Sequence, residues 1–529
     1  MPEFELFPID IVMVAVYVVV IVGIGFYVSQ HQESTDDYFL AGRSLTWSII
    51  GFSLFASNMS TSSLVGMAGD AYAYGIAVYN YEWMAALVLI IFAVFFLPFY
   101  LRAEVFTMPE FLERRYDARS RYYFSAVTVL GNIIIDTAGA LYAGALIIQI
   151  IYPEFPMWQS VVILAVLSGL YTIAGGLEAV VYTDVIQAVL LIGASIVVSI
   201  IAFNQVGSWQ AVVEATPPDM LSLIQPIDDP VLPWPGLITG VFLLGFYFWG
   251  TNQFMVQRTL GAKDLDHGRW GALFAGLLKV PVIFIMVLPG TFARVLYGPE
   301  AIETPDMVFP TMLFDLLPLG IRGLVLAALV AAIMSSVDST LNSASTLVTM
   351  DFVKKWRPNV DNRTLVIVGR VVTGIFMLLA AAWAPVILDF PSLWQYLQTV
   401  LAYLSPPVVA CFALGLFWTG ANRHSSIAGL VVGHVAAVGL ALAEWLIPGF
   451  GIQFLYLPPI LFTVSAITIV GVSLAGPAPD PATVDEYTWN PTHIEREMEH
   501  MAQFPWYKNF FVQSAALLVM IGVVLALFW

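Results

Sequence analysis

About fourteen stretches of roughly 20 apolar residues follow one another along the chain, and they constrain its fold more than any other feature. A helix of that length crosses the hydrocarbon core of a bilayer, where every backbone polar group needs a partner within the protein. The alternating ten-residue pattern of membrane β-barrels does not occur. With 59% hydrophobic and 11% charged residues, the sequence predicts an all-α polytopic membrane protein with about 14 transmembrane helices.

Basic residues between the spans predict the orientation of the chain. They concentrate in alternate loops, among them Arg114, Arg121, Arg258, Lys354 and Arg423, and the positive-inside rule places these loops on the inner side. We therefore expect a multi-pass protein of the cell membrane (plasma or inner), with both termini outside and the lipid bilayer as its surroundings. The net charge of −17 excludes a nucleic-acid partner. The expected spans are 9-29, 46-73, 78-101, 123-150, 157-175, 179-205, 234-256, 270-296, 318-350, 364-386, 393-418, 424-447, 453-475 and 508-528.

Two of these spans are interrupted by polar residues. The stretch 51-69, GFSLFASNMSTSSLVGMAG, carries hydroxyls and an amide at its middle. The stretch 240-254, GVFLLGFYFWGTNQF, has glycine every five residues and ends in Thr251, Asn252 and Gln253. A membrane helix tolerates a break only where it lines a cavity. Two broken spans, each opening a set of five, are typical of an inverted-repeat secondary transporter that binds its substrate at the middle of the membrane.

This pattern predicts a single transporter domain over 1-529 with four parts. Residues 9-29 form an extra N-terminal helix, 46-205 a first five-helix repeat, 234-418 a second and inverted five-helix repeat, and 424-528 the C-terminal helices. Because five is an odd number, the two repeats have opposite orientations in the membrane.

A third polar span, 327-351, places Ser335, Ser336 and Ser339 with Asp338 within little more than one helical turn. Hydroxyl, carbonyl and carboxylate oxygens are the ligands that hard cations prefer, and a carboxylate inside the membrane is by default functional. This helix could therefore hold sodium against the broken 51-69 segment.

Several long motifs in one order resemble the sodium/solute symporter family, and specifically its sodium-glucose cotransporter branch. The motifs are DDYFLAGRSLTW (36-47), SNMSTSSLVGMAG (57-69), YEWMAA (81-86), TMPEFLERRY (107-116), YTIAGGLEAVVYTDVIQ (171-187), LPWPG (232-236), YFWGTNQFMVQRTL (247-260), RGLVLAALVAAIMSSVDSTLNSASTLVTMDF (322-352) and LQTVLAYLSPPVVACFALGLFW (397-418). The resemblance covers essentially the whole chain.

The resemblance implies sodium-coupled uptake of a sugar or related polyol by alternating access, with sodium as the coupling ion. It assigns the first sodium site to the carbonyls of Ala56 and Met59 and to Ala332, Ser335 and Ser336. It assigns the sugar site to Asn58, Glu82, Lys279 and Gln398, the outer gate to Met67, Tyr81 and Trp394, and the inner gate to Phe248 and Trp249.

The chemistry of these residues agrees with such roles. Glu82 and Lys279 are lone opposite charges within apolar spans, so we expect them to pair, directly or through substrate hydroxyls. A sugar hydroxyl both donates and accepts hydrogen bonds, so a carboxylate, an ammonium group and two amides suit a polyol. Ser63 and Asp136 are further candidates for substrate contact. Phe248, where sugar-transporting relatives usually carry tyrosine, and Ser63, in place of a longer polar residue, leave the identity of the hexose open.

The resemblance also allows a second sodium site. Members of the family that carry two ions use positions that correspond to Asp184, Asp338 and Ser339. Two adjacent carboxylates could instead share a proton. The number of sodium ions per cycle therefore stays open.

Other functions were weighed against sodium-sugar symport. The cargo could be myo-inositol, sialic acid or another small solute, although Glu82 would repel an anion. A non-transporting sugar sensor is the main alternative of another class, and Gln398 argues against it. A channel is disfavoured because Trp249 and Trp394 are bulky. The sequence has no phosphate-binding G-x-x-x-x-G-K-[ST] loop and no H-E-x-x-H motif, so we do not expect a pump or an enzyme.

Overall fold

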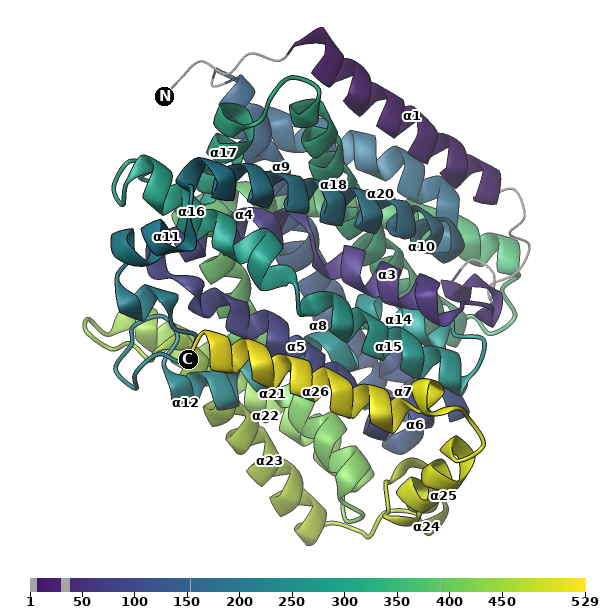
Figure 1. Ribbon diagram of the computed structural model, residues 1–529. Helices are drawn as coiled ribbons and strands as arrows, with labels where there is room; N and C mark the ends of the chain where they lie inside the picture. Colours follow the sequence, from purple (N-terminus) through teal and green to yellow (C-terminus); the bar gives the residue numbers. More distant parts are fainter. Residues whose placement is uncertain (1–6, 30–38, 153, 391) are drawn as a thin grey trace.

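A computed structural model describes residues 7–29, 39–152, 154–390 and 392–529, and within these ranges the regular structure is helical (Figure 1). Nine of the described helices are long and apolar enough to cross a membrane, or ten if the pair Leu265–Lys279 and Ile283–Tyr297, bent by 44°, counts as one span. The first residues of the DDYFLAGRSLTW motif, 36–38, lie outside the described ranges. The prediction of an all-helical membrane protein is therefore confirmed.

Each predicted span has a helical counterpart, although several counterparts are bent, broken or short. In the first half these are α1 (Pro8–Ser29), α3 (Trp47–Asn58) with α4 (Thr61–Tyr74), the run Ile76–Arg102 that contains α5 (Asn80–Ile91), α8 (Ala118–Gly131) with α9 (Ala138–Ile151), and α10 (Met157–Val206). In the second half they are α13 (Phe242–Phe246) with α14 (Gln253–Leu260), α15 (Leu265–Lys279) with α16 (Leu288–Tyr297), α18 (Ile321–Leu347), α20 (Asn362–Trp383), α21 (Leu393–Phe417), α22 (Arg423–Leu446), α23 (Leu457–Ala475) and α26 (Phe510–Leu527).

One pair of predicted spans falls within a single helical stretch. The sequence predicts two spans, 157-175 and 179-205, whereas the backbone continues as one helix, α10, of 50 residues from Met157 to Val206. Within it, Val180–Val206 is apolar and long enough to span a membrane.

The first predicted interruption is a real break between α3 and α4. Met59 has ψ 68° and Ser60 is extended, so the helix stops for two residues. The Ser60 hydroxyl then accepts the Ser63 N–H at 3.2 Å and caps the start of α4. A serine-rich sequence favours this arrangement, because serine side chains compete for the backbone groups of a helix and favour its N-terminus.

The second interruption lies at Asn252, which is extended between a π-helical turn, Tyr247–Thr251, and α14. Its side chain accepts the Phe254 N–H, and the Thr251 hydroxyl donates to the Tyr247 carbonyl. The break therefore satisfies its own backbone groups with the polar residues that the sequence places there.

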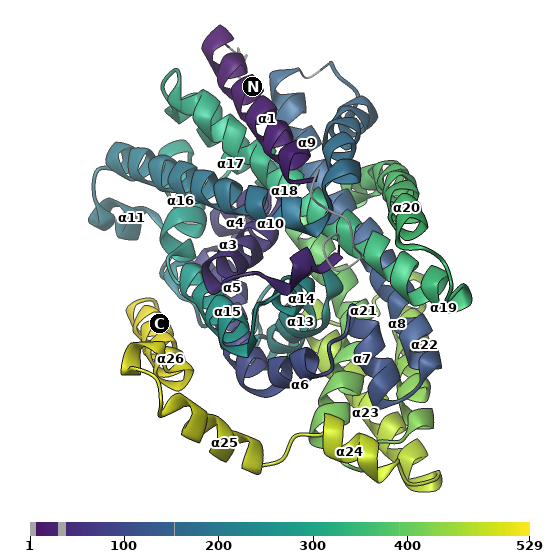
Figure 2. The same cartoon turned by 90° about the vertical axis from the view of Figure 1, so that its right-hand side faces the viewer.

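The broken helices pack at the centre of the molecule against long continuous ones. Helix α18 contacts α1, α3 and α10, α3 also contacts α15, and α4 contacts α16. At one end of the molecule, α24 (Pro481–Tyr487) and α25 (Thr492–Met501) connect α23 to the last helix, α26 (Figure 2). An ion pair of 2.5 Å between Arg269 Nη1 and Glu497 Oε2 fastens α25 to α15.

Candidate functional site

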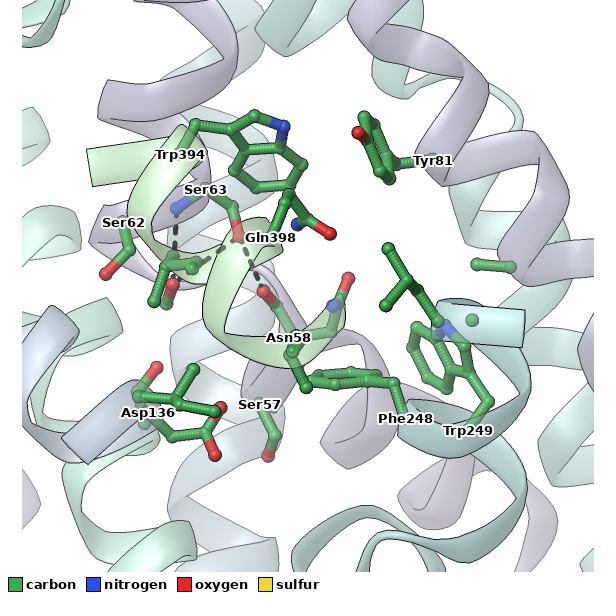
Figure 3. Close-up of a pocket in the computed structure, with 18 of the residues that line it drawn as sticks. Ser57, Asn58, Ser62, Ser63, Tyr81, Asp136, Phe248, Trp249, Trp394 and Gln398 are labelled. Carbon is green, nitrogen blue, oxygen red and sulfur yellow. Dashed lines mark hydrogen bonds between the residues drawn. The ribbon is translucent and has the colours of Figure 1, made fainter. Parts of the chain in front are cut away.

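A cavity with about 830 Å³ of space not filled by protein atoms lies where the two broken helices meet α5 and α21 (Figure 3). It brings together residues far apart in the sequence, because each broken helix ends beside it. Its lining contains these residues from the sequence prediction: Asn58, Ser63, Tyr81, Glu82, Asp136, Phe248, Trp249, Ser336, Trp394 and Gln398. Most of the predicted substrate and gate residues therefore share one cavity.

Lys279 is the predicted substrate residue that does not line this cavity. It is fully buried behind the lining, where its ammonium group donates to Glu82 Oε2 at 2.7 Å and also to the side-chain oxygen of Asn58. It lies 5.1 Å from the centre of the Trp249 ring, which adds a cation–π contact. The expected pairing of Glu82 with Lys279 is thus a direct contact. Lys279 contacts Asn58 and Glu82, which line the cavity, and so acts on the cavity only through these two residues.

Two aromatic pairs lie at opposite ends of the cavity (Figure 3). Tyr81 and Trp394 make an edge-to-face contact with ring centroids 5.3 Å apart, and Phe248 and Trp249 make another, also at 5.3 Å. Edge-to-face contact is one of the arrangements that aromatic pairs prefer. Met67, which the resemblance assigns to the outer gate, is fully buried and does not line the cavity.

The Tyr81–Trp394 pair separates this cavity from a second one. Both residues also line a space of about 930 Å³ on their other side, together with Asp70, Gln395 and a loop around Asp229. A solute that passes between the two spaces must displace these rings. The pair therefore has the position of a gate.

Polar groups from other helices complete the wall. Asp136 lies on a π-helical turn, Asn132–Thr137, between α8 and α9, and it lines the cavity beside Ser57. The Ser63 hydroxyl donates to the Asn58 carbonyl at 2.8 Å, so this hydroxyl fixes the break in the helix as well as lining the cavity. Thr340 is a lining residue that the sequence prediction missed.

The predicted carbonyl ligands of the first sodium site have lost their helical donors. In a continuous helix, the Ala56 carbonyl would accept from Ser60 N and the Met59 carbonyl from Ser63 N. Here Ser60 N donates to the Asn58 carbonyl at 2.9 Å, and Ser63 N donates to the Ser60 hydroxyl. The break thus diverts the donors of the two carbonyls that the resemblance assigns to sodium.

Helix α18 presents its serines next to this break. The Ser57 and Ser339 hydroxyls lie 3.2 Å apart, and the Thr61 hydroxyl, at the start of α4, donates to the Leu329 carbonyl at 2.9 Å. The Ser336 hydroxyl is buried and has no protein partner among the described residues. An oxygen-rich pocket of this kind fits a hard monovalent cation. The candidate residues are Ala56, Met59, Ala332, Ser335 and Ser336, and all are buried.

The residues of the possible second sodium site are joined by an arginine. Asp184 accepts from Ser335 Oγ at 2.5 Å and from Ser53 Oγ at 2.5 Å, and it forms an ion pair of 3.2 Å with Arg258. Arg258 also donates to the Ser339 hydroxyl. Asp338 is fully buried on α18.

Arg258 was the main residue that the sequence prediction missed. The positive-inside argument places it in an inner loop, but only 1% of it is exposed, and it connects α14 with α3, α10 and α18. Its position within the motif YFWGTNQFMVQRTL, six residues after the Asn252 break, was the available signal. A buried arginine requires an acid partner, and Asp184 is that partner.

Comparisons with known proteins agree with this architecture. The model of the family described as "Sodium:solute symporter family" matches residues 38–433. The sodium/glucose cotransporter 4 of Danio rerio is 36% identical over 96% of this chain and 84% of its own, and the sodium/myo-inositol cotransporter of Homo sapiens is 35% identical over 89% and 74%.

A solved structure supports the fold independently. The outward-open, substrate-bound state of a sodium-coupled sialic acid symporter superposes with a TM-score of 0.79 and 22% identity, and the match covers 90% of this chain and all of that one. The chain therefore shares the fold of that symporter. It is a sodium-coupled transporter and not an enzyme. With the broken helices, the common cavity and a family match over three quarters of its length, the chain belongs to the sodium:solute symporter family.

Proposed function

We propose that this protein couples the inward movement of sodium to the uptake of a neutral hexose by alternating access. The solute would occupy the cavity between the Tyr81–Trp394 and Phe248–Trp249 pairs, where Asn58, Glu82 and Gln398 offer amide and carboxylate groups to its hydroxyls. Asp136 and Ser63 would make further contacts. The curated relatives named above support sugars and polyols as the substrate class.

The observation that carries this proposal is the shared break in the first interrupted helix. One short stretch serves both sites: Ser57, Asn58, Ser60, Ser62 and Ser63 line the solute cavity, and the neighbouring Ala56 and Met59 carbonyls lack their helical donors beside the serines of α18. A sodium ion held by Ala56, Met59, Ala332, Ser335 and Ser336 would therefore stabilise the break that shapes the solute site. Two ligands that stabilise one conformation bind cooperatively.

We further propose that residues 46-205 and 234-418 are two inverted five-helix repeats, flanked by the helix at 9-29 and the C-terminal helices at 424-528. Both repeats open with a broken helix, at Met59–Ser60 and at Asn252. In this arrangement both termini lie outside the cell membrane. Asp184 and Ser339 already engage Arg258, so we propose that sodium binds at the first site and not between these two residues.

Uptake into proteoliposomes tests the proposal. A sodium gradient directed inward should drive the accumulation of labelled glucose or galactose, whereas potassium and choline gradients should not. Ser335→Ala should raise the sodium concentration that gives half-maximal uptake by about tenfold, because it removes one ligand oxygen. Ser345→Ala, on the same buried helix but away from the break, is the matched control and should leave it unchanged. Equal uptake in choline would refute sodium coupling.

Myo-inositol is the second candidate cargo. It is supported by the 35% identity to a sodium/myo-inositol cotransporter, and by Phe248, whose ring can stack on a polyol but offers no hydroxyl. Competition of unlabelled glucose, galactose, mannose and myo-inositol against one labelled sugar would rank the apparent affinities of these four solutes. A preference for myo-inositol of more than about tenfold would replace the hexose as the proposed substrate.

A further inference from the structure

A pair of buried aspartates lies beyond the Tyr81–Trp394 gate, outside the solute site and the first sodium site. Asp70 is on α4, and Asp306 is on the short turn Pro305–Met307 that precedes α17 (Val308–Leu316). Only 3% of Asp70 and 2% of Asp306 is exposed. Each aspartate directly follows a residue of one close contact, Gly69 against Pro305, so the two carboxylates lie on adjoining segments.

Close packing holds the two segments together. Gly69 lies against the backbone of Pro305, where any larger residue would overlap the Pro305 carbonyl oxygen. Because Gly69 directly precedes Asp70 in the chain, this contact brings the Pro305 carbonyl close to Asp70. On the other side, Gly66 lies against Trp394, so α4 touches the start of α21 as well. The two carboxylates therefore sit where three segments meet.

The start of α21 supplies two hydrogen-bond donors. The Leu393 N–H donates to Asp306 Oδ2 at 3.0 Å, and the Ser392 hydroxyl is a hydrogen-bond partner of Asp70. The other carboxylate oxygen of each residue, Oδ1, is buried and has no protein partner among the described residues. A buried carboxylate oxygen without a donor is costly, and here two of them occur in one place.

No basic side chain is available to neutralise this pair among the described residues that line the adjoining cavity of about 930 Å³. Arg294 on α16, which packs against α4, donates instead to the Tyr72 carbonyl at 3.0 Å. Tyr81, which lines the same cavity as Asp70, brings no positive charge either. Two carboxylates in one buried site stay charged only with a cation between them, and otherwise take up a proton.

We propose that Asp70 and Asp306, with Ser392 and the Pro305 carbonyl, form a second cation site that takes a hard monovalent ion, sodium, from the cavity beyond the gate. All of these groups are oxygen donors, which suit an alkali cation. The bound ion joins α4 to the start of α21, which carries Trp394 and Gln398. The inference rests on the proposed sodium symport, because the ion is the coupling ion.

A sodium titration of thermal stability tests this site apart from the first one. The full-length protein carrying Ser335→Ala, which weakens the first site, is purified and melted in sodium chloride balanced against choline chloride. We expect sodium to raise its melting temperature. Adding Asp70→Asn or Asp306→Asn should raise the sodium concentration that gives half of this stabilisation by about tenfold or more. The charge of the ligands sets the affinity of such sites for the ion. Asp315→Asn, at a partly exposed aspartate that bonds to Tyr297, is the control and should change nothing.

A sodium response that is the same in the Asp70→Asn, Asp306→Asn and Asp315→Asn proteins would overturn the inference. The inference would also be overturned if acid stabilised the protein in choline chloride without sodium and Asp70→Asn abolished that effect. Such a result would mean that the pair holds a proton.

Carbodiimide labelling of the unmutated protein is a second test, which does not depend on the folding of a variant. Sodium should protect Asp70 and Asp306 from modification. Equal labelling in choline would contradict the site. Sodium-independent sugar uptake would refute the proposed function alone, because these binding measurements do not depend on transport.

Discussion

Lys279 is the residue on which the solute cavity depends most, although it does not line the cavity itself. It satisfies Glu82 and Asn58 together, and all three side chains are buried or nearly so. Removing one member of a buried ion pair leaves the other charge without a partner, at a cost of about 3–5 kcal/mol. The pair therefore fixes the orientation of both cavity-facing groups.

We expect Lys279→Ala to reduce sugar uptake by at least about a hundredfold, because an unpaired Glu82 loses its position. Initial rates in proteoliposomes, normalised to the amount of folded protein by gel filtration, measure this effect. Lys508→Ala, at a lysine outside the cavity, should keep normal rates. Full uptake by the Lys279→Ala protein would show that the ion pair has no part in transport.

Arg258 gives a second prediction, this time on stability. Arg258→Gln leaves Asp184 buried without its cation, and we expect it to lower the free energy of unfolding by about 3–5 kcal/mol. The double variant Arg258→Gln with Asp184→Asn removes both charges and should recover most of that loss. Thermal unfolding in detergent gives the comparison. If the double variant were as unstable as the sum of the single ones, the two residues would not act as a pair.

At the scale of the helix, small residues set how closely the broken segments pack. Gly290, near the start of α16, lies against the Ala68 carbonyl, and a Cβ added there would overlap that oxygen. Close approach through glycine is typical of membrane helices. The second half of the first broken helix, α4, thus rests directly on the backbone of α16.

Gly290→Ala should destabilise the protein by about 1–3 kcal/mol, since the clash is with backbone and cannot be relieved by a side-chain movement. Gly193→Ala on α10, where nothing lies within 4 Å of the added carbon, is the matched control and should be neutral or slightly stabilising. Melting temperatures of the two purified variants would show the difference. A Gly290→Ala protein as stable as the wild type would mean that α4 and α16 separate easily.

The helices show which features of the fold could be predicted from the sequence alone. The break at Met59–Ser60 could be predicted because serines and an asparagine in mid-membrane have few other uses. The contact between Glu82 and Lys279 could be predicted because each was the only charge of its sign nearby. The Asp184–Arg258 pair could not, since Arg258 lies close to the end of its span and looked like an ordinary loop residue. The continuity of α10 was not predicted either.

At the scale of the whole molecule, cysteine labelling tests the proposed orientation in the membrane. The only cysteine, Cys411, is fully buried, so single cysteines can be introduced without a reactive background. We expect Trp529→Cys, at the exposed C-terminal end, to react with a membrane-impermeant maleimide in intact cells. Arg119→Cys, in a predicted inner loop, should react only after the cells are permeabilised. The reverse pattern would invert the proposed topology.

The internal neutralisation of Glu82 by Lys279 also bears on the return step of the cycle. Because the two groups compensate each other without a solute, the vacant cavity carries no net charge from them as it reorients. Under the proposed symport, we therefore expect the empty transporter to return without cargo, and so to give net uphill accumulation as well as one-for-one exchange of labelled and unlabelled molecules across the bilayer.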